Sequence, residues 1–188
     1  NSAGLFAARF WWMCRWIGIE SVAILDGGIN AWKQQGGKVT TEVPVLNKTH
    51  GLKVKQSLEH AVDVDVVIKA SNQLNRTIAD VRAAERFRGE VEPIDPVAGH
   101  VPNAINIPLS DNYDAEGRFL SKDKLQQIYL SKLGEYKAND PILMCGSGVT
   151  ACLSRFCIEL AELPPASVYP GSWSEWLRDP SRGVATGE

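Results

Sequence analysis

The segment Ile142–Phe156, which reads ILMCGSGVTACLSRF, decides the fold that we predict for this chain of 188 residues. Residues 141–144 form a short apolar run without alternation, typical of a strand buried on both faces of a parallel sheet. Cys145 follows at once, two glycines come within the next three residues, and the apolar spacing over 150–163 predicts a helix. A strand, a tight loop and a helix in this order indicate an α/β protein with functional residues at the carboxyl edge of its sheet.

The same alternation continues on both sides of this segment. Short apolar runs predict strands at 77–81, 104–106 and 168–169, and helical spacing predicts helices at 57–69, 121–133 and 172–177. Ser57 and Ser121 are the expected N-caps of the first two helices. Strands that alternate with helices predict an α/β fold, a parallel sheet with helices on both faces.

The N-terminal part resembles the end of a domain rather than a whole one. A helical stretch, a predicted strand at 22–25 and a short helix that ends at Gly36 follow one another. A parallel sheet needs more strands than this piece supplies. We therefore expect residues 1–37 to be the C-terminal remnant of a first domain, 38–55 an interdomain linker and 56–188 a complete second domain.

Composition and charge narrow the classes of function. A formal net charge of −2 from mixed signs predicts neither a nucleic-acid partner nor a membrane partner. No apolar run approaches the roughly 20 residues of a membrane span, and nothing at the start resembles a signal peptide. Three of the four cysteines gather in one strand–loop–helix segment, a poor disulfide framework, so we expect a reducing, cytoplasmic location. No histidine–cysteine spacing fits a zinc site, and no metal is expected.

The loop after residue 144 favours an anionic sulfur. Gly146 and Gly148 let the backbone curl so that successive N–H groups point at one spot, and the helix that follows adds its positive end. Together these groups favour a thiolate at Cys145. The alternative is a buried structural cysteine, which requires neither glycine. For Cys152 and Cys157, within the predicted helix, we favour packing roles.

The six residues Cys145–Thr150 resemble the active-site loop of the two-domain rhodaneses, in the form found in 3-mercaptopyruvate sulfurtransferases. Further matches to that family lie, in the same order, at 25–28, 80–82, 85–89, 99–102 and 171–176. The resemblance implies a rhodanese-like fold, a catalytic domain at 56–188, and a preceding non-catalytic rhodanese domain of which most is missing here. It also implies an enzyme without a cofactor.

The resemblance implies roles for individual residues. Cys145 is the nucleophile that takes up sulfur as a persulfide, and Ser147 assists catalysis. Arg86 holds the carboxylate of the donor, for which its planar fork is suited; the alternative is a surface ion pair with Glu85 or Glu90. The remaining donor-binding residues are the rest of the loop: Gly146, Gly148, Val149 and Thr150.

Two features bear on the choice of donor. The uncharged Gly146 and Ser147 favour 3-mercaptopyruvate, because thiosulfate enzymes carry an Arg-Lys pair after the cysteine. Asp95, however, stands where family members with a firm mercaptopyruvate preference tend to carry a second arginine, so thiosulfate stays open. The expected acceptor is a thiol, such as that of thioredoxin, or cyanide.

Other residues near the loop have expected structural roles, and two other functions compete. Arg82 is expected to tie the loop down through Asp80 or another carboxylate, and His100 to order a Gly-His-Val-Pro turn. A phosphatase of the same fold would need an arginine at position 151, which is Ala151. A catalytically inert fragment that serves as a binding or regulatory module is the other alternative.

Overall fold

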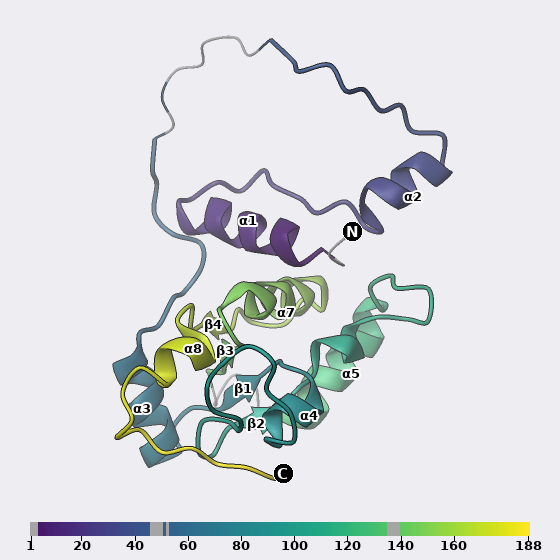
Figure 1. Cartoon of the computed structure of the whole chain (residues 1–188). Coiled ribbons are helices and arrows are strands. Elements are labelled where there is room, and N and C mark those ends of the chain that lie inside the picture. Colours follow the sequence, from purple (N-terminus) through teal and green to yellow (C-terminus); the bar gives the residue numbers. More distant parts are fainter. Residues whose placement is uncertain (1–3, 46–50, 52, 135–139) are drawn as a thin grey trace.

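The computed structural model describes residues 4–45, 51, 53–134 and 140–188 (Figure 1). The helices are α1 (Leu5–Trp16), α2 (Gly28–Gln34), α3 (Val64–Gln73), α4 (Ala84–Phe87), the 3₁₀ helix η1 (Leu109–Asn112), α5 (Lys122–Leu133), α7 (Val149–Leu160) and α8 (Ser172–Trp176). The strands are β1 (Ile78–Asp80), β2 (Ile105–Asn106), β3 (Ile142–Met144) and β4 (Ser167–Val168).

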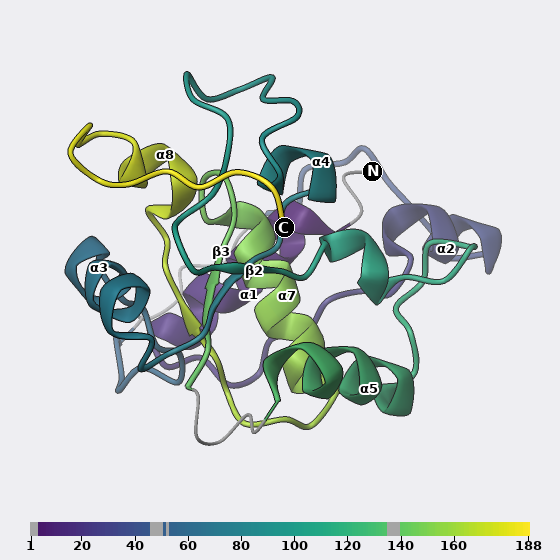
Figure 2. The same cartoon turned by 90° about the horizontal axis from the view of Figure 1, so that it is seen from below.

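The four strands form one parallel sheet in the order β2-β1-β3-β4. Leu143 packs into a core cluster with α1, α5 and α7, whereas Ile142 and Met144 pack into a second cluster with α3 and α8. Figure 2 shows α3 and α8 on one side of the strands and α5 and α7 on the other. Because both faces of β3 are covered, its sequence is apolar without alternation. The predicted parallel α/β sheet with helices on both faces is confirmed.

Two predicted elements were wrong. The helix expected from Ser57 begins at Val64, because the Asp63 carboxylate caps it by accepting the N–H of Val66 at 3.1 Å. The run at 22–25 is not a strand. Among the described residues no neighbouring strand pairs with it, and Val22 and Ile24 pack against the core cluster around α7 instead, while Leu25 is exposed. The short helix α4 lies where the sequence predicted only loop.

Helix α1 lies against α7 (Figure 1). Trp11 and Trp12 are buried in the core cluster, and the Trp11 ring meets that of Phe156 edge to face at 5.1 Å. The opposite side of α1 is open, with Phe6 68% and Phe10 65% exposed. Helix α1 therefore shares a core with the sheet and α7, while the assignment of 1–37 and 56–188 to different domains stays a prediction.

A buried carboxylate also joins the N-terminal part to α7. Glu59 lies between Arg15 of α1, at 2.7 Å, and Arg155 of α7, at 2.8 Å, with its side chain fully buried. A buried charge is tolerated only when it is paired. The two arginines therefore fix the position of Glu59 relative to α1 and α7.

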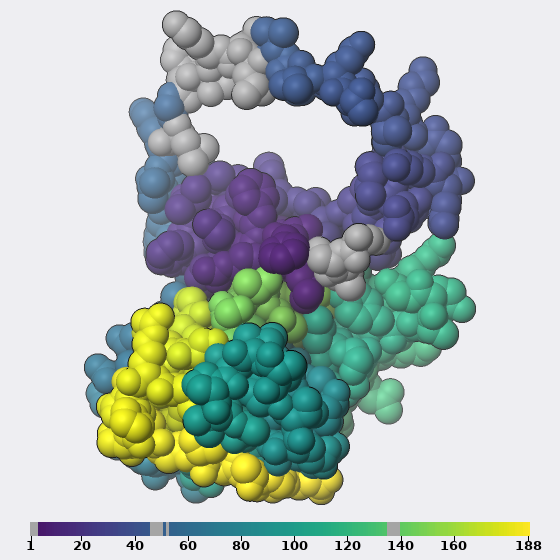
Figure 3. All heavy atoms as spheres, viewed as in Figure 1, coloured from purple at the N-terminus to yellow at the C-terminus, as the bar shows by residue number. Residues whose placement is uncertain are grey.

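Residues 38–45, in the expected linker, are exposed and form no helix or strand (Figure 3). Residues 46–50 and 52 of that linker lie outside the described residues. Of the helices that the structure describes, none combines the length and apolar character that a membrane span requires.

Candidate active site

Strand β3 delivers Cys145 to the carboxyl edge of the sheet, directly after Met144. The backbone N–H of Cys145 donates to the Ser172 hydroxyl at 3.0 Å, and the carbonyl of Cys145 accepts the N–H of Trp173 at 2.9 Å. The start of α8 therefore holds the backbone of Cys145 from a position 27 residues along the chain. The residue itself is 1% exposed.

The loop after Cys145 is curled by its second glycine. Gly148 has φ +76°, which an L side chain rarely adopts, and a Cβ there would lie 2.2 Å from the carbonyl oxygen of Pro170. Both facts require glycine at this position. Helix α7 starts at Val149, one residue before the predicted start. The loop is tied to α8 as well, since the Gly146 carbonyl accepts the N–H of Ser174 at 2.9 Å.

The sulfur of Cys145 has one polar neighbour among the described contacts, the Ser172 hydroxyl at 4.0 Å. In the part of the chain that the structure describes, no amide of the loop donates a hydrogen bond to Sγ. The thiol therefore does not make the ring of amide contacts that the sequence predicts, and Ser172, to which the sequence analysis assigned no role, lies nearest. Ser172 belongs to the segment 171–176 that matches the family, but the sequence of that segment does not indicate that it contacts β3.

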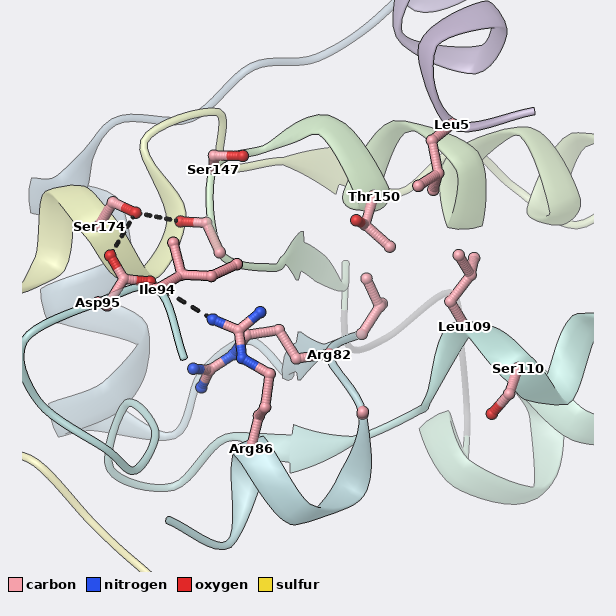
Figure 4. Close-up of a pocket in the computed structure, with 13 residues that line it drawn as sticks. Leu5, Arg82, Arg86, Ile94, Asp95, Leu109, Ser110, Ser147, Thr150 and Ser174 are labelled. Carbon is pink, nitrogen blue, oxygen red and sulfur yellow. Dashed lines mark hydrogen bonds and ion pairs between the residues drawn. The ribbon is translucent and has the colours of Figure 1, made fainter. Parts of the chain in front are cut away.

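A cavity of about 350 Å³ opens beside the loop (Figure 4). Of the predicted site residues it brings together Arg86, Gly146, Ser147 and Thr150. Cys145, Gly148 and Val149 do not line it. The remaining lining residues come from several elements: Leu5, Val81, Arg82, Ala83, Ile94, Asp95, Leu109, Ser110 and Ser174.

Arg86, on α4, is held by two carboxylates at the edge of this cavity. Its Nη2 lies 2.5 Å from Glu92 Oε1 and 3.5 Å from Asp95 Oδ2. The alternative ion pair with Glu85 or Glu90 was wrong, since Glu90 pairs with Arg88 at 2.7 Å. None of the described hydrogen bonds uses Nη1 of Arg86, which would lie 3.7 Å from a Cβ at Gly146. Both terminal nitrogens of Arg86 lie 3.7 Å from that position, and Nη1 is the one without a described hydrogen bond.

Arg82 is structural, as predicted. It donates to Asp80 Oδ2 at 2.7 Å, to the carbonyl of Gly99 at 2.6 Å and to Glu92 Oε2 at 3.2 Å, and it lies over the ring of Trp173. Every charged group around it is buried, so these contacts fix the strand end and the loops on either side of it.

Glu92, which the sequence analysis did not single out, is the group that joins the two arginines. Burial acts to raise its pKa, but the hydrogen bond from Arg86, the amides of Asp95 and Ile94 and the charge of Arg86 outweigh burial, so the pKa is lowered. Glu92 is therefore a carboxylate at neutral pH. Glu92 lies six residues after Arg86, in the loop that follows α4. The sequence periodicity of helices and strands does not predict an ion pair across a loop.

A family model for the rhodanese-like domain matches residues 63–179. The chain belongs to the rhodanese-like family. It is 41% identical over 189 residues to a Pseudomonas aeruginosa protein named "Probable 3-mercaptopyruvate sulfurtransferase", covering 100% of this chain and 66% of the relative. It is 36% identical over 187 residues to a Mycobacterium tuberculosis protein named "Putative thiosulfate sulfurtransferase SseB", covering 100% and 64%. The chain thus spans slightly less than two thirds of the length of these curated relatives.

A solved structure has the same fold. The anaerobic ergothioneine biosynthesis enzyme from Chlorobium limicola, in complex with its natural substrate trimethyl histidine, superposes with a TM-score of 0.87 at 25% identity. The match covers 100% of this chain and 47% of that one.

Three further titratable residues of this rhodanese-like domain, His100, Cys152 and Cys157, have structural surroundings. His100 Nδ1 lies 2.7 Å from the carbonyl oxygen of Phe87, and the two rings stack at 3.7 Å, which orders the turn as predicted. Burial, only partly offset by Arg9, raises the pKa of Cys152 to about 11. Burial also raises the pKa of Cys157 well above its ordinary value. Both cysteines stay protonated at neutral pH, which disfavours them as nucleophiles.

Proposed function

We propose that this chain carries the catalytic site of a sulfurtransferase, in which Cys145 takes up a sulfur atom and passes it on. The observation that carries the proposal is the position of Cys145, at the carboxyl edge of the sheet and at the base of a loop that borders the cavity with Arg86 and Ser147. The names of the relatives support two donors, 3-mercaptopyruvate first and thiosulfate second.

The reaction begins with attack of the Cys145 thiolate on the sulfur of 3-mercaptopyruvate. A bond forms between the two sulfur atoms as the carbon–sulfur bond breaks, and its electron pair remains on pyruvate as the enolate. The enolate takes up a proton with the help of Ser147, which is exposed at the rim. With thiosulfate, the sulfur–sulfur bond breaks instead and sulfite leaves. An acceptor thiolate or cyanide then attacks the outer sulfur and releases Cys145.

The outer sulfur of the persulfide, rather than Sγ itself, is the atom that we place among the loop amides. A sulfur–sulfur bond adds about 2 Å to the side chain, and the amides at the entrance of α7 carry partial positive charge that stabilises an anion. The curl of the loop at Gly148 supports this placement. The four cysteines of the chain are free, which supports a reducing compartment, the cytoplasm in our proposal, and thioredoxin as the protein acceptor to test first.

The mass of the protein tests the proposal. After incubation with 3-mercaptopyruvate or thiosulfate, and removal of the donor, we expect the gain of one sulfur atom, localised by peptide mapping to Cys145. Cys152→Ala is the matched control and should load in the same way. Absence of an adduct with both donors would instead support the inert binding module, and an adduct on Cys152 would contradict the assignment of the nucleophile.

The surroundings of the loop disfavour a phosphatase. Such an enzyme needs an arginine that grips phosphate from the end of the loop, and Ala151 occupies that position. The next arginine, Arg155, is 1% exposed and pairs with Glu59. Neither residue 151 nor residue 155 therefore supplies the cation that would hold a phosphate dianion from the end of the loop.

Replacement of Arg86 by alanine should act mainly on donor binding. We expect KM for 3-mercaptopyruvate to rise about tenfold, the value of one charge-assisted hydrogen bond, with kcat changed less than about threefold. Steady-state kinetics measures both constants, and Arg86→Lys should restore part of the loss because it keeps the charge but not the fork. Arg88→Ala, which removes a half-buried arginine that pairs with Glu90 and does not line the cavity, is the control. An unchanged saturation curve in Arg86→Ala would remove Arg86 from the site.

A further inference from the structure

Asp95 has a carboxylate oxygen without a hydrogen-bond partner beside the catalytic loop. The side chain is 8% exposed, and its Oδ1 accepts the Ser174 hydroxyl at 2.7 Å. Its Oδ2 is buried and accepts no hydrogen bond from the described residues; its nearest charged neighbour is Arg86 Nη2 at 3.5 Å. Figure 4 shows Asp95 and Arg86 on the same wall of the cavity, beneath Ser147. A buried acceptor without a hydrogen bond is costly, so a donor group of a ligand would be favoured at this oxygen.

Carboxylates outnumber the arginines around the cavity. The described lining residues include two cations, Arg82 and Arg86. Three carboxylates contact them: Asp80, Glu92 and Asp95. Arg82 donates to Asp80, to Glu92 and to a carbonyl, so most of its donors are already used within the protein. A purely anionic donor would meet one partly occupied guanidinium and an adjacent carboxylate, and the carboxylate would repel it.

Nη1 of Arg86 and Oδ2 of Asp95, the two atoms without a described hydrogen bond, both lie near Gly146. A Cβ at Gly146 would lie 3.7 Å from Arg86 Nη1 and 3.9 Å from Asp95 Oδ2. Because Gly146 has no side chain, a ligand can approach the donor and the acceptor together at that point. The carboxylate and the ammonium group of an α-amino acid share one carbon, so a single ligand can meet an ion pair whose members are 3.5 Å apart.

We propose that Asp95 makes the cavity select a zwitterionic sulfur donor, an α-amino acid whose side chain ends in a sulfane sulfur. Arg86 Nη1 holds the carboxylate and Asp95 Oδ2 accepts from the ammonium group. This inference rests on the proposed sulfur transfer and names the class of its preferred donor. 3-Mercaptopyruvate, which carries a carboxylate and a neutral carbonyl, remains a donor with a lower kcat/KM.

The transfer from such a donor balances without an oxidant or a reductant. The Cys145 thiolate attacks the outer sulfur of a persulfide R–S–SH, a bond forms between Sγ and that sulfur, and the sulfur–sulfur bond of the donor breaks. The donor leaves as the thiolate R–S⁻, and the proton stays on the sulfur now bound to Cys145. The charge is −1 on each side of the reaction.

A matched pair of donors tests the proposal. Cysteine persulfide and 3-mercaptopropionate persulfide, both prepared fresh without oxygen, differ only in the ammonium group. We expect kcat/KM for loading of Cys145, measured by mass, to favour cysteine persulfide about tenfold or more, the value of a charge-assisted hydrogen bond. In Asp95→Asn the ratio should fall below about threefold, and loading by thiosulfate should become faster, because a repulsive charge is gone.

The controls separate the possible failures. Glu90→Gln removes a carboxylate outside the cavity and should keep the wild-type ratio. If Asp95→Asn does not fold, N-acetylcysteine persulfide on the unaltered chain makes the same comparison, since acetylation removes the ammonium charge; it should load as slowly as the 3-mercaptopropionate compound. Equal loading by all three persulfides, or a ratio unchanged in Asp95→Asn, overturns the selection by Asp95 while leaving sulfur transfer intact. Absence of loading by every donor overturns the proposed function itself.

Discussion

Replacement of Cys145 by serine should abolish sulfur transfer and lower turnover by at least about 1,000-fold with either donor, because the nucleophile itself is removed. A serine hydroxyl stays protonated at neutral pH and cannot hold a sulfur atom as a persulfide. The fold should be preserved. Serine has a similar size, and the backbone contacts of residue 145 to Ser172 and Trp173 do not involve its side chain.

Steady-state turnover with 3-mercaptopyruvate and with thiosulfate measures this effect, together with a thermal unfolding curve that reports on the fold. Cys152→Ala is the matched control, since it removes a neighbouring thiol that is protonated at neutral pH. It should keep turnover within a few-fold. More than a few per cent of the wild-type rate in Cys145→Ser would mean that sulfur moves by a route that does not use Cys145.

Replacement of Gly148 by alanine should destabilise the protein and displace the loop that follows Cys145. We expect a loss of about 3 kcal/mol in the free energy of unfolding, the sum of left-handed strain and overpacking. The new methyl group would lie 2.2 Å from the carbonyl oxygen of Pro170, a backbone atom that cannot turn away. The loop must then move, and Cys145 and Gly146 move with it, so turnover should fall more than stability alone explains.

Gly117→Ala separates the two causes. Gly117 has φ +74°, nearly that of Gly148, yet a Cβ there meets nothing within 4 Å. It therefore carries the strain without the clash, and we expect a loss of only about 1 kcal/mol with turnover unchanged. Chemical denaturation measures both variants. Equal losses in Gly117→Ala and Gly148→Ala would show that contact with Pro170 does not hold the loop.

What the sequence alone determined is local. The unbroken apolar run Ile142–Met144 predicts a strand covered on both faces, because a side chain on either face of a parallel sheet must be apolar. Asp80 and Arg82, two residues apart on an extended segment, point to the same face, so their pairing could be anticipated. Gly148 could be recognised because a curl between a strand and a helix requires a positive φ.

Local patterns also misled at two points, each for a tertiary reason. Ser57 and Asp63 both satisfy the rule for an N-cap, and the structure uses Asp63, at the start of a helix whose Val67 and Ala70 pack in the core cluster with β1 and β3. The run at 22–25 has the composition of a strand, but a strand exists only where a neighbouring strand supplies its hydrogen-bond partners. Among the described residues no such neighbour is present at that position.

What only the tertiary structure decided is the electrostatics and the surroundings of the sulfur. Arg86, Glu92 and Asp95 meet because a loop folds back on α4, and Ser172 reaches the backbone of Cys145 across 27 residues. The sequence identified Asp95 as a departure from the family, yet the contact of its Oδ2 with Arg86, and the lack of a hydrogen bond to that oxygen from the described residues, depend on that return of the chain. Periodicity reports which face of an element is buried, whereas contacts between distant side chains are set by the path of the backbone, which periodicity does not encode.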